Sequence, residues 1–168
     1  MNRRLLVVGA AAAAAGTGFA LWKTRSRFDE AGALWEMQFE QPDGSMLIMA
    51  SLRDRPLLLN FWATWCAPCV KEMPMLDRFY REHRARGWQV VGLAVDQVAQ
   101  VREFLTGLPM SFPIGLAGMG GVALSRMLGN RDGALPFTIV FDRSGRVLDR
   151  KLGAIEPEDL ARWASRAS

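Results

Sequence analysis

Hydrophobic and polar residues follow two periods along this chain, one typical of strands and the other of helices. The stretch Leu34–Glu40 alternates apolar and polar residues, which predicts a half-buried strand. The near-continuous apolar runs Pro56–Ala63 and Trp88–Val95 are typical of strands buried on both faces. Phe112–Leu116 predicts a short strand, and Phe137–Phe141 predicts another in the C-terminal half.

Helical spacing of apolar residues separates these strands. It predicts helices over residues 68–86, 97–105, 122–128 and 157–167. Turn residues at Gln41–Gly44 and Asp142–Gly145 predict two hairpins, with Met46–Ala50 and Arg146–Leu152 as their returning arms. This order predicts an α/β fold in which helices flank a central mixed sheet, with a β-hairpin near its N-terminus.

The N-terminal segment differs from the rest of the chain. Met1–Arg4 is short and basic, and the run Leu5–Trp22 that follows carries no charge. This pattern predicts a signal peptide or a membrane anchor over residues 1–27, which leaves one domain over residues 28–168.

Charge is distributed unevenly and excludes one class of partner. The chain has 21 Lys and Arg against 17 Asp and Glu, a net charge of +4. The basic residues that precede the first acidic residue, Asp29, account for this excess. Because Asp29–Ser168 is close to neutral, it has no surplus of cations for a phosphate backbone, and we expect no nucleic-acid partner.

The candidate chemistry lies at the only two cysteines, Cys66 and Cys69, where a buried strand is followed by a helix. Two intervening residues let both sulfurs meet across the first helical turn. Backbone N–H groups and the helix dipole stabilise a thiolate at the helix start, so Cys66 is the expected nucleophile and Cys69 the resolving cysteine.

Other uses of a cysteine pair fit less well. A zinc site needs two more ligands, and His83 on the same predicted helix is the only histidine. A purely structural disulfide across so short a loop constrains the unfolded chain little. A haem-attachment motif needs a histidine directly after the second cysteine, where Val70 stands. We therefore expect a redox dithiol with no metal or other cofactor.

The residues around this pair carry a specific resemblance. Asn60–Cys69, followed by Glu72-Met73-Pro74, resembles the TlpA/ResA-type thiol-disulfide oxidoreductases of the thioredoxin superfamily, and Leu135–Thr138 matches their second landmark. The resemblance implies a thioredoxin-like fold and work on the periplasmic side of the cytoplasmic membrane, by an anchored or exported protein. Its implied partners are protein dithiols and disulfides, with a membrane electron donor that recycles the dithiol and apocytochrome c as the leading family substrate.

The resemblance also implies roles for individual residues. Pro136 matches the family's cis-proline, and the backbone of Leu135 beside it would pair with a substrate segment. Trp65 would form an apolar wall of the site. Glu72 would help to move the proton of Cys69, because Asn60 stands where thioredoxin itself has a buried aspartate. A solvated helix carboxylate is the alternative for Glu72.

These features predict a thiol-disulfide oxidoreductase, and two other functions compete with it. A peroxiredoxin-like peroxidase requires threonine three residues before its cysteine, but Ala63 holds that position and Thr64 is one residue too late. A binding module with an inert disulfide would keep its function when Cys66 is replaced.

Overall fold

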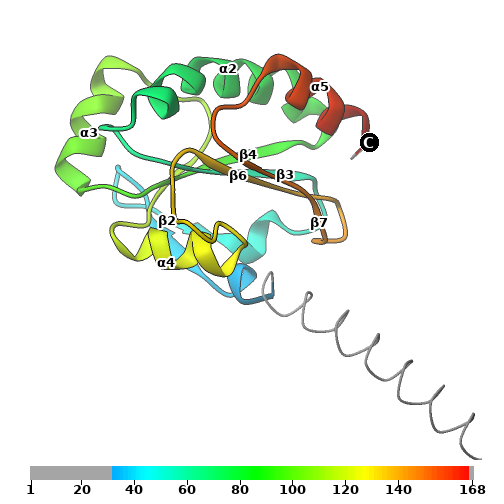
Figure 1. Ribbon diagram of the computed structural model, residues 1–168, viewed down its shortest axis with the longest axis horizontal. Coiled ribbons are helices and arrows are strands. Elements are labelled where there is room, and N and C mark those ends of the chain that lie inside the picture. The colour runs from blue at the N-terminus through cyan, green and yellow to red at the C-terminus, as the bar shows by residue number, and fades with distance from the viewer. Residues whose placement is uncertain (1–31, 167–168) are drawn as a thin grey trace, which may run out of the picture.

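A computed structural model describes residues 32–166, and a five-stranded sheet in the order β5-β4-β3-β6-β7 forms its centre (Figure 1). The central strand β3 pairs in parallel with β4 and antiparallel with β6, so the sheet is mixed, as predicted. The five strands are β3 (Leu57–Trp62), β4 (Gln89–Ala94), β5 (Ile114–Leu116), β6 (Phe137–Phe141) and β7 (Val147–Leu152).

Helices cover both faces of this sheet. α2 (Ala67–His83), α3 (Val98–Gly107) and α5 (Pro157–Arg166) contribute to one hydrophobic cluster, and α4 (Gly120–Met127) contributes to the other. Figure 1 shows α2 and α5 on one side of the sheet and α4 on the opposite side. The described residues therefore form three layers with a core on each side of the sheet.

The central position of β3 in the sheet explains why its sequence is so continuously apolar. All six of its residues are buried. Leu58 and Trp62 belong to the hydrophobic cluster on the side of α2. Leu57, Leu59 and Phe61 belong to the cluster on the side of α4. Asn60 has the same parity as Leu58 and Trp62, so the single polar residue of the strand faces α2.

A two-stranded sheet precedes the central one. β1 (Gln38–Glu40) and β2 (Met46–Ile48) pair antiparallel around a turn in which Gly44 has φ of 86°. This hairpin packs closely on β5, since a Cβ atom on Gly115 would lie 2.9 Å from Cβ of Phe39. Only glycine leaves room for that approach.

The predicted strand over Leu34–Glu40 is wrong in its first half. Residues 32–35 form a helical turn, and only Gln38–Glu40 is extended. Leu34 and Trp35 are both buried, and neighbouring residues on a half-buried strand point to opposite faces. Trp35 makes an edge-to-face contact with Phe141 of β6, and a local sequence pattern cannot predict a contact between residues so far apart in the chain.

The other predicted elements lie within a few residues of their observed positions. The predicted helix over 68–86 ends as an α-helix at His83 and continues as the short 3-10 helix η2 (Arg84–Arg86) before Gly87, which has φ of 92°. A second 3-10 helix, η1 (Met49–Leu52), begins within the predicted arm Met46–Ala50, directly after β2.

The segment predicted as a signal or anchor, residues 1–27, lies outside the described residues. Within residues 32–166, no helix combines the length and the apolar character needed to cross a membrane.

Candidate functional site

Cys66 and Cys69 form a disulfide at the point where β3 gives way to α2. Their Cα atoms are 5.2 Å apart. Cys66 is the N-cap of α2 and is 6% exposed, whereas Cys69 lies inside the first turn and is 0% exposed. Cys66 is therefore the slightly more exposed residue of the pair.

The start of α2 provides the electrostatic setting that the sequence predicts. The helix has 17 residues, with a proline in its first turn and no acidic residue there. The unpaired N–H groups of the first turn favour negative charge at the N-cap. The stabilisation of a thiolate on Cys66 in the reduced protein stays a prediction.

Glu72 lies one helical turn after Cys69 and is buried, with 3% of its surface exposed. Its Oε1 accepts a hydrogen bond of 2.8 Å from Nδ2 of Asn60, and its Oε2 accepts one of 2.8 Å from the backbone N–H of Ile155. The alternative of a solvated helix carboxylate is therefore wrong.

Burial raises the pKa of the Glu72 carboxyl above its ordinary value. The hydrogen bonds from Ile155 and Asn60 and the positive charge of Lys151 act in the opposite direction and offset part of this effect. A carboxyl in this state exchanges a proton closer to neutral pH than a solvated one does, which suits acid–base work.

Asn60 holds Glu72 in place. Its Nδ2 also donates to Oγ1 of Thr138 at 3.0 Å, so one amide group bridges α2 and β6. Its Oδ1 is buried and has no partner among the described residues. Asn60 thus contacts the neighbouring carboxyl and, as an amide, does not titrate.

Pro136 lies where the sequence predicts it, in the turn before β6, and its bond to Leu135 is cis. The strand register places Phe61, Phe137 and Leu152 side by side. The Pro136 loop therefore reaches the same end of the sheet as the loop that carries the cysteines. The carbonyl of Pro136 accepts a hydrogen bond of 2.9 Å from the N–H of Gly153.

Apolar side chains are exposed at this end of the sheet. Trp65, directly before the cysteine pair, is 70% exposed, and Leu135 is half-buried. Met119, which follows β5, is also exposed. The topology brings the loops after β3 and β5 and the loop before β6 to the same end of the sheet, because β6 runs antiparallel to β3. The sequence gives no local signal for Met119, since its position depends on the sheet order.

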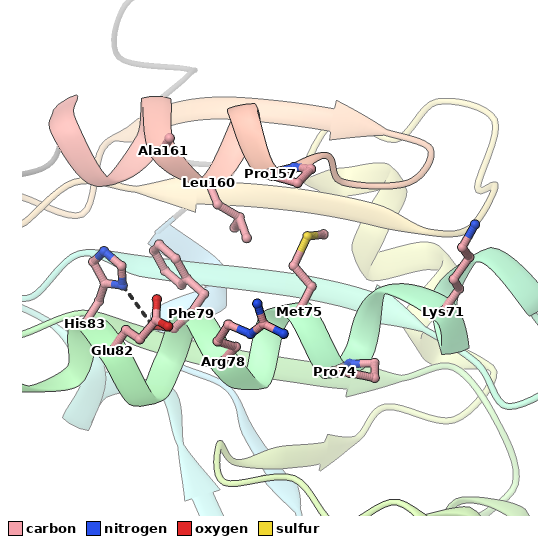
Figure 2. Close-up of a pocket in the computed structure, with 10 residues that line it drawn as sticks. All are labelled: Lys71, Pro74, Met75, Arg78, Phe79, Glu82, His83, Pro157, Leu160 and Ala161. Atoms are coloured by element: carbon pink, nitrogen blue, oxygen red, sulfur yellow. Dashed lines mark hydrogen bonds between the residues drawn. The ribbon is translucent and has the colours of Figure 1, made fainter.

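A separate groove runs between α2 and α5 (Figure 2). Met75 and Phe79 of α2 point toward Leu160 of α5, with Lys71 at one end and His83 at the other. None of the residues predicted for the site lines this groove. Its lining residues are Lys71, Pro74, Met75, Arg78, Phe79, Glu82, His83, Pro157, Leu160 and Ala161.

Metal-binding clusters are absent from the part of the chain that the structure describes: residues 32–166 contain no group of three or more His, Cys, Asp or Glu that could hold an ion.

Comparison with known proteins defines the class to which this fold and disulfide belong. The Redoxin family matches residues 36–163, and the chain belongs to that family. It is similar to a thiol-disulfide oxidoreductase ResA of Bacillus cereus, with 28% identity over 120 residues, 70% of this chain and 66% of that protein. The corresponding protein of Geobacillus kaustophilus is 29% identical over 115 residues, 68% of this chain and 64% of that protein. The chain thus spans slightly less than two thirds of these relatives.

Solved structures agree with this placement. The structure of MTB dsbF in its mixed oxidized and reduced forms has a TM-score of 0.70 and 26% identity, and the match covers 81% of this chain and 98% of that one. A thiol:disulfide interchange protein of the thioredoxin family from Chlorobium tepidum TLS has a TM-score of 0.68 and 29% identity, and the match covers 78% of this chain and 92% of that one. The thioredoxin-like fold predicted from the sequence is confirmed.

Proposed function

We propose that this protein is a thiol-disulfide oxidoreductase that reduces disulfides in other proteins. The observation that carries the proposal is the arrangement at the start of α2: Cys66 is the N-cap and the slightly more exposed cysteine of the disulfide, and the buried carboxyl of Glu72 lies one turn beyond Cys69. In this proposal Cys66 reacts with the partner, and Cys69 passes its proton to Glu72.

In the first step the Cys66 thiolate of the reduced protein attacks one sulfur of a substrate disulfide. The substrate S–S bond breaks, a Cys66–substrate disulfide forms, and the departing substrate sulfur takes up a proton. The exposed Trp65 and the Leu135–Pro136 loop would contact the substrate segment around its sulfur, with the Leu135 backbone pairing with extended chain.

In the second step the thiol of Cys69 loses its proton, and the resulting thiolate attacks Sγ of Cys66. The Cys66–Cys69 disulfide forms, the second substrate sulfur leaves as a thiol, and two electrons have passed to the substrate. Glu72 is the proposed acceptor of the Cys69 proton, because the raised pKa of its carboxyl suits proton transfer near neutral pH.

The same proposal includes a cellular setting. The protein would work on the periplasmic side of the cytoplasmic membrane, anchored or exported through residues 1–27, and a membrane dithiol donor would restore its reduced form. Its substrates would include the disulfides of apocytochrome c or related redox-active proteins. The relatives named ResA support the chemistry of this proposal, and the apolar run Leu5–Trp22 supports the location.

Trapping of a mixed disulfide tests the chemistry. The Cys69→Ala variant should accumulate disulfide-linked complexes through Cys66, because the second step cannot occur. The Cys66→Ala variant is the matched control and should accumulate none. If Cys69→Ala forms no such complex with a protein disulfide, or if Cys66→Ser keeps full function as a binding module would, the proposal fails.

A reporter that is active only after export tests the location. Fused after Ser168, it should be active, and an identical fusion that lacks residues 1–27 should be inactive. Activity of a cytoplasm-dependent reporter at the same position would contradict the proposed setting.

Peroxidase activity is less well supported by the site. Oγ1 of Thr64 donates a hydrogen bond of 2.6 Å to Oδ2 of Asp96, and the N–H of Thr64 donates to the same oxygen at 2.8 Å. This hydroxyl is therefore engaged away from a peroxide at Cys66. We expect peroxide consumption by the reduced protein to be no faster than by an ordinary dithiol.

A further inference from the structure

A row of polar residues crosses three strands beneath Glu72. In the register of the sheet, Asn60 of β3 pairs with Thr138 of β6, and Thr138 pairs with Lys151 of β7. Residues directly opposite each other on paired strands have their side chains on the same face. Because Asn60 contacts Glu72 of α2, all three side chains lie on the face that α2 and α5 cover.

Lys151 is held at the far end of this row by Asp159. Its ammonium donates to Oδ2 of Asp159 in the first turn of α5. Oδ2 of Asp159 also accepts from the N–H of Glu156 at 3.0 Å, and its Oδ1 accepts from Arg162 at 2.8 Å. The carboxylate of Asp159 thus accepts hydrogen bonds from three donors. Two of them remain when Lys151 is replaced.

The short segment between β7 and α5 connects the two carboxyls. The N–H of Ile155 donates to Glu72, and the N–H of the next residue, Glu156, donates to Asp159. Lys151 lies just before this segment, and its positive charge acts on Glu72. One cation is therefore bonded to Asp159 and also acts on Glu72 through its charge.

We propose that Lys151 is a positioning residue for Glu72, which allows the buried carboxyl to carry negative charge before it accepts the proton of Cys69. This inference rests on the proposed function of Glu72. Its physical basis is that a charge buried without an ion partner is costly, and neither Asn60 nor the N–H of Ile155 supplies a countercharge.

The other charged groups nearby do not supply one either. On α2, Lys71 is exposed to solvent. On β7, Arg150 donates to the carbonyl of Leu128 after α4, and Asp149 accepts from Nε1 of Trp163. Glu156, in the segment before α5, is exposed and negative. Strands β3 and β6 present the uncharged Asn60 and Thr138.

The test compares the two lysines of the described chain in the full-length protein. Lys151→Met removes the charge and keeps the length of the side chain, and Lys71→Met removes an exposed charge next to Glu72 in sequence. Titration of the Glu72 carboxyl, followed by NMR of carbon-13-labelled glutamate and assigned with Glu72→Gln, should give a higher pKa in Lys151→Met. Lys71→Met and Lys151→Arg should titrate like the unaltered protein.

Loss of fold does not explain such a result, because Lys151→Arg keeps the charge and Asp159 keeps Arg162 and Glu156 as donors. An unchanged titration of Glu72 in Lys151→Met overturns the inference. So does an equal change in Lys71→Met, because the effect would then be a general consequence of removing a cation.

Kinetics separate this inference from the proposed function. Reduction of a protein disulfide by Lys151→Met should be about three- to tenfold slower near neutral pH, less than the loss expected for Glu72→Gln. A changed Glu72 titration with an unchanged rate would support the electrostatic role of Lys151 and contradict Glu72 as the proton acceptor. If Glu72→Gln slows the reaction but Lys151→Met changes neither quantity, the proposed function stands and the role of Lys151 is refuted.

Discussion

Glu72 and Asp159 are two carboxyl groups with little exposed surface and opposite shifts in pKa. They are 3% and 6% exposed and lie on α2 and α5, on the same face of the sheet. Burial raises the pKa of Glu72, and two uncharged donors and the charge of Lys151 offset only part of this effect. Burial also acts to raise the pKa of Asp159, but the hydrogen bonds from Lys151, Glu156 and Arg162 outweigh it, and the pKa falls to about 2.

The comparison shows that the depth of burial and the partners of a carboxyl together decide its charge. A carboxylate bonded directly to cations offsets its desolvation cost through them and stays ionised down to low pH. A carboxyl bonded to neutral donors stays closer to the balance between its two forms and can exchange a proton. The first arrangement anchors α5, and the second is suited to act on Cys69.

The largest effect that this contrast predicts concerns Glu72. Glu72→Gln keeps the shape but cannot take up a proton, so turnover with a protein disulfide should fall about 100-fold, the lower range for a positioned acid–base group. Stopped-flow measurement of mixed-disulfide decay should place the loss in the second step. The exposed carboxyl of Glu82 on the same helix provides a control, and Glu82→Gln should react at the normal rate.

Asp159 should dominate stability in acid. Because the pKa of its carboxyl is lowered to about 2 in the folded protein, its contribution is present above the unfolded value of about 3.9 and is lost as pH falls toward 2. The contribution amounts to about 2 kcal/mol. Urea unfolding of Asp159→Asn should show this deficit at neutral pH and a much smaller one near pH 2, relative to the unaltered protein. An equal deficit at both pH values would mean that the carboxylate charge is not responsible.

Glu72 should make the free energy of unfolding depend on pH with the opposite sign. The folded-state pKa of its carboxyl is raised, so the stability it contributes is present below its unfolded value and is lost as pH rises through the folded value. The free energy of unfolding of the unaltered protein should therefore decline with pH in this window relative to Glu72→Gln. Parallel pH profiles for the two proteins would show that the carboxyl is not destabilised by burial.

The smallest expected effect concerns the polar row beneath Glu72. Thr138→Val removes the hydroxyl that accepts from Asn60, while Asn60 keeps its bond to Glu72. The free energy of unfolding should fall by about 1 kcal/mol, the typical net value of one hydrogen bond. Thr106→Val, at an exposed threonine of α3, is the matched control and should change little. A large loss of turnover in Thr138→Val would show that the row does more than hold Asn60.

Much of the fold and the core of the site could be predicted from the sequence because their signals are local. The apolar run of β3 and the periodic helix α2 adjoin the cysteine pair, so the position of the disulfide at a helix start follows from neighbouring residues alone. The cis bond before Pro136 was also predicted, and the structure confirms it. The resemblance, rather than any spacing, supplied that expectation.

The environment of Glu72 was decided by tertiary structure. Its spacing from Cys69 was visible in the sequence, but burial was not, because its partners Asn60 and Ile155 lie 12 and 83 positions away along the chain. The same holds for Lys151, which no motif singles out. The error at Leu34 and Trp35 has the same origin, since their burial depends on contacts such as that with Phe141. Periodicity reports which face of an element is apolar, whereas the charge state of a buried group depends on which distant donors the fold brings to it.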